Sequence, residues 1–560
     1  MKNILNRLSR RFSLPQLFVL LAFLLVFGAI LICPLISLFS KAFLDKYGNY
    51  AGLANYQKYF NNPNLSISIW NTIDISLVST VFSVVLAFLF AYALTRSNLK
   101  GKTLFKYIAM IPIFIPTIIH AVGLVYLFGK QGVITRMGWD IGLYGRTGII
   151  ISEVIFTFPQ AFLMFFVALE YADGRLYDAA EAMGISPVKR FFRITLPDVK
   201  YTVINAFFVC FTLAFADFGA PKVLGGNYNV LATDIYKQIA GQFNMNMGAV
   251  VGSLLLIPAV ISFIVDRIVR SKNSSTLNAK ATKLVIKKSF KRDSLFFVFC
   301  TVISLCFLVL VAALFMGALT EYYPYKMDFT WKNFEFNNST GGIGSFYHSL
   351  EMSVATAVFG TAFVFIYAYL CEKIRKFGAL RKIGKLFSVL PMALPGMVIG
   401  ISFIFFFNNK HNPLNFIYGT IIILVLSNIL HYFSVPFITA TGALKKLDAE
   451  FESVAESMNI PRWKTLLRVT VPLSLPAILE IFMYYFVNAM VTVSAVVFLY
   501  SANFRIASIA ISHMEEAGNI SQAAAMGLLI LLINVIVRIL YEIAVKIIQF
   551  KRKKKEERTI

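Results

Sequence analysis

Long apolar runs alternate with short polar and basic segments along the whole chain of 560 residues. The hydrocarbon core of a bilayer is about 30 Å thick, and a helix needs about 20 apolar residues to span it. Twelve runs approach that length, near residues 15–40, 70–95, 104–129, 147–170, 201–220, 249–269, 294–318, 348–371, 383–407, 416–440, 476–500 and 522–548. We therefore predict an all-α polytopic membrane protein with twelve transmembrane helices.

The apolar pattern occurs twice in the same order. Three stretches of the first half match stretches of the second, namely 53–56 with 331–334, 71–94 with 348–371, and 111–116 with 390–395. Because the matches keep their order and an equal span parity, we expect two parallel six-helix repeats rather than inverted ones. The predicted segments are a first half at 1–270, a polar basic linker at 271–293, a second half at 294–550 and a basic tail at 551–560.

Composition and charge narrow the class of protein further. Charged residues make up 14% of the chain, against about 25% in soluble domains, which excludes a soluble globule. The net charge is +25, and 41 of the 53 Lys and Arg residues lie in loops on the side of the two termini. Because Lys and Arg concentrate in cytoplasmic loops, both termini are predicted to be cytoplasmic. Nucleic-acid binding is not expected, because the basic residues form short clusters between apolar runs.

Two polar loops, each between the fourth and fifth predicted helices of its half, share one sequence pattern. We call them the first signature loop (residues 171–200) and the second signature loop (residues 441–475). Within them, DAAEAMGISPVKRFFRITLP at 178–197 aligns with SVAESMNIPRWKTLLRVTVP at 453–472, at a constant offset of 275. A merely well-capped loop would explain one copy, but not two copies at corresponding positions.

The shared pattern predicts a helix, a sharp turn and a second short helix. Gly184 stands where a residue of positive φ would end the first helix, and Asn459 stands there in the second loop. Ser186 and Pro187 supply an N-cap and a first-turn proline for the second helix, whereas Pro461 alone serves in the second loop. We expect a rigid knob on each half.

An E-A-A-type helix, a Gly three residues after the Glu and a closing Leu-Pro pair make the first loop similar to the coupling loop of bacterial binding-protein-dependent ABC importer permeases. The resemblance implies a type I permease fold in a bacterial cytoplasmic membrane. It also implies a small-molecule substrate delivered by an extracytoplasmic solute-binding protein, and two copies of a separate ATPase docked on the loops. By position, the expected ATPase-coupling residues are Ala180, Glu181, Gly184, Ala455, Glu456 and Asn459.

ATP chemistry is expected on the partner rather than on this chain. The fragment most similar to a phosphate-binding loop is Gly101-Lys102-Thr103, but Arg96 stands where the P-loop pattern requires Gly. None of the five cysteines has a metal-ligand spacing. We therefore expect no catalytic residue, metal site or cofactor here, with ATP and Mg²⁺ on the ATPase, and the chain is not expected to be an enzyme.

The substrate expectation rests on two stretches of sequence. Fused two-half permeases occur in the ferric-iron, thiamine and 2-aminoethylphosphonate branches of the family. Residues 217–254 and 490–528 are most similar to the aminoethylphosphonate branch. The resemblance implies 2-aminoethylphosphonate as the substrate, with ferric iron as the alternative.

Polar residues inside apolar helices by default face a cavity or a partner. The predicted pathway residues are Asn205, Thr212 and Asp217 in the first half and Asn488, Thr492 and Ser494 in the second. Asp217, which aligns with Thr492, either contacts a passing ammonium group, gates the path, or is a helix-end carboxylate held by Lys222. His120 and His431 are expected to be packed residues rather than ligands.

Two other classes of membrane protein remain open. A twelve-helix secondary transporter of the major facilitator type also has parallel halves, but it needs coupling carboxylates at the bilayer midplane and has no need of matched loops. A membrane-embedded enzyme would need a convergent cluster of acidic, His or Cys residues, and the sequence offers no such cluster.

Overall fold

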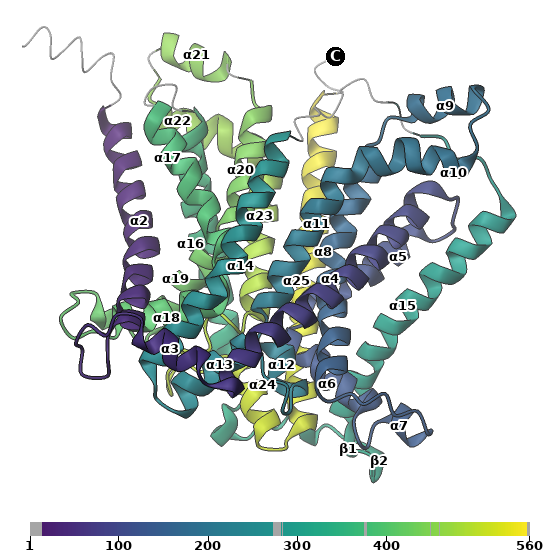
Figure 1. Cartoon of the computed structure of the whole chain (residues 1–560). Coiled ribbons are helices and arrows are strands. Elements are labelled where there is room, and N and C mark those ends of the chain that lie inside the picture. Colours follow the sequence, from purple (N-terminus) through teal and green to yellow (C-terminus); the bar gives the residue numbers. More distant parts are fainter. Residues whose placement is uncertain are drawn as a thin grey trace, which may run out of the picture. The chain divides into compact units, whose positions relative to one another are not determined.

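The structure is a computed structural model of the chain, shown in Figure 1. It describes residues 14–272, 282, 284–373, 378–448, 450–458 and 460–556. Parts of the predicted linker (271–293) and of the predicted basic tail (551–560) lie outside the described residues. The described chain is mostly helical and contains a β-hairpin of β1 (Thr320–Tyr322) and β2 (Lys326–Phe329).

Long apolar helices form most of both halves. In the first half they are α2 (Leu14–Phe43), α4 (Pro63–Arg96), α6 (Thr117–Phe128), α8 (Arg146–Glu170), α11 (Leu196–Ala216) and α14 (Met245–Lys272). In the second half they are α15 (Phe290–Leu319), α16 (Gly344–Lys373), α18 (Gly396–Phe407), α19 (Ile421–His431), α20 (Ser434–Lys446), α23 (Val471–Val491) and α25 (Ile520–Glu556). Within the described residues, ten helices are long and apolar enough to cross a membrane, or up to twelve if each of two bent pairs is one span. The predicted all-α polytopic fold is confirmed.

Shorter helices link the long ones or extend them. They are α3 (Ala54–Phe60), α5 (Lys102–Met110), α7 (Val133–Arg136), α12 (Gly219–Leu224), α13 (Leu231–Tyr236), α17 (Gly378–Val389) and α24 (Ala507–Glu516). Pro112 and Pro116 separate α5 from α6 through a 3-10 turn. Pro391 and Pro395 separate α17 from α18 in the same way, with a bend of 107°. Proline lacks an N–H donor and clashes with the preceding turn, so the helices break at the predicted places.

Two predicted spans end earlier than the apolar runs that suggested them. α11 ends at Ala216 rather than near residue 220, and α23 ends at Val491 rather than near residue 500. Val493 and residues 495–499 are nonetheless buried in turns of the chain. Their apolar character reflects packing against protein, which hydropathy alone does not distinguish from a lipid-spanning helix.

The first helix of each half packs with the opposite half. Contacts divide the chain into two compact units, and residues up to Lys41 belong with 345–506, whereas α15 belongs with the first half. Phe27 of α2 has its ring centroid 4.3 Å from that of Phe433. Phe307 of α15 lies 5.2 Å from Phe158 in the same measure. Packing units and sequential halves are therefore different divisions of the chain, and the predicted boundaries stay predictions.

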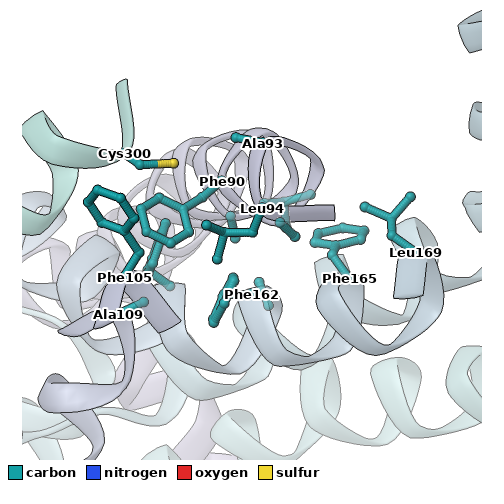
Figure 2. Packing of buried hydrophobic residues seen from close by; sticks show 14 of the residues in the cluster. Phe90, Ala93, Leu94, Phe105, Ala109, Phe162, Phe165, Leu169 and Cys300 are labelled. Atoms are coloured by element: carbon teal, nitrogen blue, oxygen red, sulfur yellow. The ribbon is translucent and has the colours of Figure 1, made fainter. Parts of the chain in front are cut away.

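Aromatic and small residues of α4, α5 and α8 form the core of the unit that contains the first signature loop. Figure 2 shows Phe90 of α4, Phe162 of α8 and Cys300 of α15 in this cluster. The Phe90 and Phe162 rings meet edge to face at 5.3 Å, an arrangement that the ring quadrupoles favour. This packing fixes the end of α8, from which the first signature loop departs.

The two repeats also share a contact at the end of their first helices. Asn55 of α3 donates from its side-chain amide to two carbonyl oxygens at the end of α2, at 2.9 and 2.7 Å. Asn333 donates in the same way to two carbonyl oxygens at the end of α15, at 3.0 and 2.7 Å. The last carbonyls of a helix have no partner within it, so each Asn closes a helix end.

Candidate functional site

The first signature loop begins with α9 (Gly174–Ala182), which Asp173 caps. The Asp173 side chain accepts a hydrogen bond from the Arg175 N–H at 3.1 Å and pairs with the Arg175 guanidinium at 2.6 Å. The guanidinium lowers the pKa of Asp173 to about 2, so this cap is ionised at neutral pH. Asp448, at the equivalent position, accepts a hydrogen bond at 3.0 Å from a backbone N–H at the start of α21 (Glu450–Ser457).

A left-handed glycine ends α9, as the sequence predicts. Gly184 has a φ of +67°. Its N–H donates to the Glu181 carbonyl at 2.9 Å, and the Ile185 N–H donates to the Ala180 carbonyl at 2.9 Å. These two bonds form a Schellman motif, which satisfies the last carbonyls of the helix.

The second loop repeats this turn as far as the described residues reach. The Ile460 N–H donates to the Ala455 carbonyl at 2.8 Å, as the equivalent pair does in the first loop. Asn459 lies outside the described residues, and the side chain of Glu456 is not described. The coupling roles expected for these two residues stay predictions.

A second short helix follows each turn. α10 (Pro187–Arg190) is capped by Ser186, whose hydroxyl accepts a hydrogen bond from the Lys189 N–H at 3.5 Å. α22 (Arg462–Thr465) starts directly after Pro461. The predicted helix-turn-helix is therefore present in both loops.

Each loop joins its long helix through a π-helical turn that sequence reasoning missed. These turns are η2 (Phe191–Thr195) before α11 and η8 (Leu466–Thr470) before α23, at the same offset of 275. In both, the N–H that follows the turn donates to the carbonyl five residues earlier. Pro197 and Pro472 come next, and the wider turn relieves the clash of a proline ring with the carbonyl four residues earlier.

Both loop helices are fastened to the end of the second helix of their half, by different chemistry. Arg96, the last residue of α4, lies over the Tyr177 ring at 5.1 Å, and the Tyr177 hydroxyl hydrogen-bonds the Thr195 hydroxyl at 2.8 Å. Lys373, the last residue of α16, forms an ion pair with Glu452 at 3.1 Å. A cation–π contact in one half thus occupies the place of an ion pair in the other.

The predicted coupling residues divide between two faces of the loop helices. Ala180 and Ala455 are buried, 1% and 8% exposed, so these side chains hold each helix against its own unit. Glu181 and Gly184 lie on the exposed side. Of the first loop's predicted set, these two are therefore placed where a partner could reach them.

Exposed apolar side chains cover both loops at matched positions outside the predicted coupling set. The pairs, each 275 residues apart, are Leu176 with Phe451, Ala179 with Val454, Met183 with Met458, Val188 with Trp463, and Phe192 with Leu467. Met183 is 69% exposed and Trp463 is 61% exposed. Grouped exposed apolar residues mark interaction surfaces on proteins.

Glu181 is a charged residue on the exposed side of the first loop. Its carboxylate forms an ion pair with Lys287 of the linker, and Arg190 lies 3.4 Å away. The Lys287 ammonium lowers the pKa of Glu181, which keeps the carboxylate ionised at neutral pH. Sequence reasoning could not foresee the partner from the linker, because the two residues are 106 positions apart.

Asp217 and Thr492 occupy equivalent places, as their alignment predicts. They cap the C-termini of α11 and α23 with extended backbones, ψ being 140° and 135°. The Asp217 carboxylate accepts hydrogen bonds from the Thr117 hydroxyl at 2.8 Å and from a backbone N–H of α12 at 2.9 Å. The expectation that Lys222 holds Asp217 is wrong, because Lys222 forms its ion pair with Glu516.

The other predicted pathway residues are spread along α11, α23 and the turn after α23. Thr212 and Asn488 each donate to a carbonyl four residues earlier in their own helix, at 2.8 and 2.7 Å. Asn205 is partly buried on α11. Ser494 lies so close to Gly396 that a Cβ added there would come within 2.4 Å of the Ser494 hydroxyl. Their roles in transport stay predictions.

Glu153 is a buried acidic residue that sequence reasoning missed. It lies in α8, fully buried, with its carboxyl against that of Asp217. Asn428 and Thr492 occupy the two equivalent positions in the second half, so only the first half places acids there. An acidic residue inside the apolar run 147–170 was the available signal.

Histidine and acidic side chains do not gather into a metal centre in the described part of the chain, where no group of three His, Cys, Asp or Glu residues could hold an ion. His120 is fully buried in α6, and His431 is partly buried in α19. Both are packed within helices, as expected.

Comparison with known proteins identifies the repeated unit. The family described as "Binding-protein-dependent transport system inner membrane component" matches residues 83–274 and again residues 365–548. The chain belongs to this family. Each half of the permease carries one match, and each match includes one signature loop.

The permease is similar over most of its length to two bacterial ferric transport proteins. The putative ferric transport system permease protein FbpB 1 of Haemophilus influenzae is 27% identical over 509 residues, covering 87% of this chain and 78% of that protein. The ferric transport system permease protein FbpB of Actinobacillus pleuropneumoniae is 26% identical over 501 residues, covering 85% and 70%. A chain of a solved bacterial alginate ABC transporter is 20% identical, with a TM-score of 0.40, and covers 50% of this chain and 99% of that one.

These matches establish the coarse identity of the protein. It is a fused two-domain, multi-pass inner-membrane permease of the ABC importer class, related to ferric permeases. Its relatives are transport permeases rather than enzymes, which agrees with ATP hydrolysis on a separate subunit. The relatives do not support the aminoethylphosphonate branch.

Proposed function

We propose that the permease moves a small solute from an external solute-binding protein into the cell, driven by two copies of an ABC ATPase docked on its two signature loops. The observation that carries the proposal is the set of five exposed apolar pairs at equivalent positions of the two loops. A secondary transporter has no use for two such matched surfaces. Both termini lie on the ATPase side in this proposal.

Each loop combines what a docking element needs. Its base is fixed, because Tyr177 and Glu452 fasten the two helices to the ends of α4 and α16. Its exposed face is apolar and therefore gains free energy when a partner covers it. The π turns connect each loop directly to α11 and α23, so movement of a docked ATPase passes to the helices that end in Asp217 and Thr492.

The docking proposal is tested by replacing Trp463, the tryptophan among the exposed apolar residues of the second loop. We expect Trp463→Ala to weaken binding of the ATPase by roughly 30-fold or more, because buried aromatic residues at interface centres contribute about 2 kcal/mol or more. Trp139→Ala is the matched control, because Trp139 is 74% exposed but lies between α7 and α8, away from the signature loops. Equal binding by both variants would refute the docking role of the second loop.

Ferric iron is the proposed substrate. Two relatives that match most of this chain are named ferric transport permeases, which supports this choice. 2-Aminoethylphosphonate is the second candidate, favoured by the resemblance of residues 217–254 and 490–528 to that branch. The two substrates differ in kind, since one is a hard cation and the other an anionic zwitterion.

Uptake into proteoliposomes separates the two substrates. The permease is reconstituted with its ATPase and its solute-binding protein, and radiolabelled ferric iron or radiolabelled 2-aminoethylphosphonate is supplied outside with ATP inside. We expect ATP-dependent accumulation of iron and none of the phosphonate. Accumulation of the phosphonate alone would overturn the substrate proposal and leave the docking proposal standing.

A further inference from the structure

The linker between the two halves lies along the first loop helix. The Gly174 N–H, at the start of α9, donates to the Thr282 carbonyl at 2.9 Å. The Thr282 N–H lies 3.4 Å from the Asp173 carboxylate, which also caps α9. At the other end of α9, Lys287 forms an ion pair with Glu181. The linker therefore contacts α9 near both of its ends, and residues 284–289 run on into α15 (Figure 1).

The linker backbone packs directly against Gly174. A Cβ at this position would lie 3.0 Å from the Thr282 carbonyl oxygen and 3.0 Å from the Leu284 Cα. These are backbone atoms, so they cannot move aside as a flexible side chain would. The absence of a side chain at Gly174 is what admits the linker.

The linker is also hydrogen-bonded to the first turn of α15. Arg292, in the first turn of α15, donates to the Lys287 carbonyl at 2.6 Å. The neighbouring Asp293 accepts hydrogen bonds from the Ser289 N–H at 3.2 Å and from the Asn98 N–H at 3.1 Å, which ties α15 to the turn after α4. The backbone around Lys287 is thereby anchored to the same unit as α9.

The two signature loops differ in this respect at the level of sequence. Ala449 aligns with Gly174 at the offset of 275, so the position that admits the linker in the first loop carries a side chain in the second. The glycine against which the linker packs is therefore present in the first loop and replaced by alanine in the second.

We propose that linker residues 282 and 284–288 form part of the ATPase docking surface of the first signature loop, with Lys287 as a positioning residue for the Glu181 carboxylate. This inference rests on the proposed docking of an ATPase on the loops. The outward face of the segment suits such a contact, because Val285 is 84% exposed and the Lys287 side chain is 80% exposed. Leu176 of α9 and Met183, which caps its C-terminus, are exposed apolar residues of the same loop.

The occupant of this surface is the ATPase subunit rather than lipid. Lys287 and Arg190 both pair with Glu181, and Arg292 binds the Lys287 carbonyl, and such a density of charge is unfavourable inside a bilayer. A groove on a folded partner can take the apolar side chain and keep the charges at its rim, as protein interfaces commonly do.

The test uses the full chain with its ATPase, in a Trp463→Ala background that weakens the second loop. Val285→Asp introduces a charge at a highly exposed site, so folding of the permease is unaffected. We expect about a tenfold or greater loss of ATPase affinity, because an apolar contact would be replaced by a buried, unpaired carboxylate. Lys410→Asp is the matched control, since Lys410 lies in the loop after α18, on the opposite side of the membrane in the proposed topology.

A second variant reports on Lys287 itself. Lys287→Ala is expected to reduce the salt dependence of ATPase binding and of ATP-driven uptake, and Lys287→Arg to restore both, as a positioning role through charge requires. Unchanged affinity in Val285→Asp would overturn the inference. The docking proposal fails separately, by an unchanged affinity of Trp463→Ala in the otherwise natural chain.

Discussion

The ion pair between Lys373 and Glu452 should decide how firmly the second loop helix is held. Its two side chains are 10% and 17% exposed, and their charged atoms lie 3.1 Å apart. At an effective dielectric constant of about 20, this separation corresponds to an attraction of about 5 kcal/mol. Desolvation of the two ions offsets much of it. Removal of one partner from a fully buried pair costs about 3–5 kcal/mol, so we expect about 2–3 kcal/mol for Glu452→Ala at this partly hydrated site.

Hydrogen exchange of the α21 backbone measures this cost directly. A loss of 2–3 kcal/mol corresponds to exchange that is about 30- to 150-fold faster when α21 opens locally. The backbone of α9 is an internal control, because its fastening by Arg96 and Tyr177 is untouched. A change of less than threefold in α21, or an equal change in α9, would refute the reasoning.

The repeat supplies a rescue experiment for the same contact. The double variant Lys373→Arg with Glu452→Tyr transplants the cation–π contact of the first half into the second. We expect it to recover about 0.5–2 kcal/mol of the roughly 2–3 kcal/mol that Glu452→Ala loses, which is the contribution of Arg over an aromatic ring. Exchange as fast as in Glu452→Ala would mean that the two fastenings are not interchangeable.

Three further predictions follow from single contacts. Gly184→Val should destabilise the first loop turn by about 1–2 kcal/mol, because a side chain is strained at φ of +67°, and faster proteolysis of the loop would report it. Asn55→Ala and Asn333→Ala should lower the melting temperature of the protein by similar amounts, because each variant loses two hydrogen bonds, worth about 1–3 kcal/mol per variant. Strongly unequal shifts of the melting temperature would contradict the equivalence of the repeats. The pKa of Glu516 is lowered from 4.5 to about 2, chiefly by its hydrogen bond with His513. The ionised Glu516, which also pairs with Lys222, should therefore stabilise α24 above pH 4.5, and this contribution should be lost as the pH falls toward 2. Protection of the α24 amides from hydrogen exchange, relative to free amides, that stays constant over this range would contradict the prediction.

Features with a local cause could be predicted from the sequence. Apolar runs of sufficient length gave the spans, and proline pairs marked the breaks at Pro116 and Pro395. The positive φ of Gly184 and the cap by Ser186 follow from the short-range geometry of a helix end. Each of these depends on residues within a few positions of one another.

Features that depend on distant residues could not be predicted. The burial of Ala180 and the pairing of Lys222 with Glu516 are set by tertiary packing, which the local pattern does not contain. The packing of the linker against Gly174 is also set by tertiary structure, so the glycine in the sequence did not reveal it. The π turns carried a signal, a proline just inside a long helix, but a kink or a helix start would have produced the same pattern.

The substrate could be predicted least well. The relatives point to ferric iron, whereas two stretches of sequence resemble another branch. Fold and family are shared by permeases for chemically different solutes, so the choice depends on the site and on the binding protein rather than on the architecture.

The central claim is that two signature loops couple this permease to ATP hydrolysis, and uptake by the reconstituted assembly tests it most directly. ATP-driven uptake is compared between the natural chain and the double variant Glu181→Ala with Glu456→Ala, at equal amounts of folded permease in the liposomes. We expect uptake to require ATP and to fall at least about tenfold in the double variant, because an ion pair or charged hydrogen bond at a docking surface contributes about 1.5–3 kcal/mol. Uptake that persists without ATP, or that is equal in the two proteins, would contradict the claim.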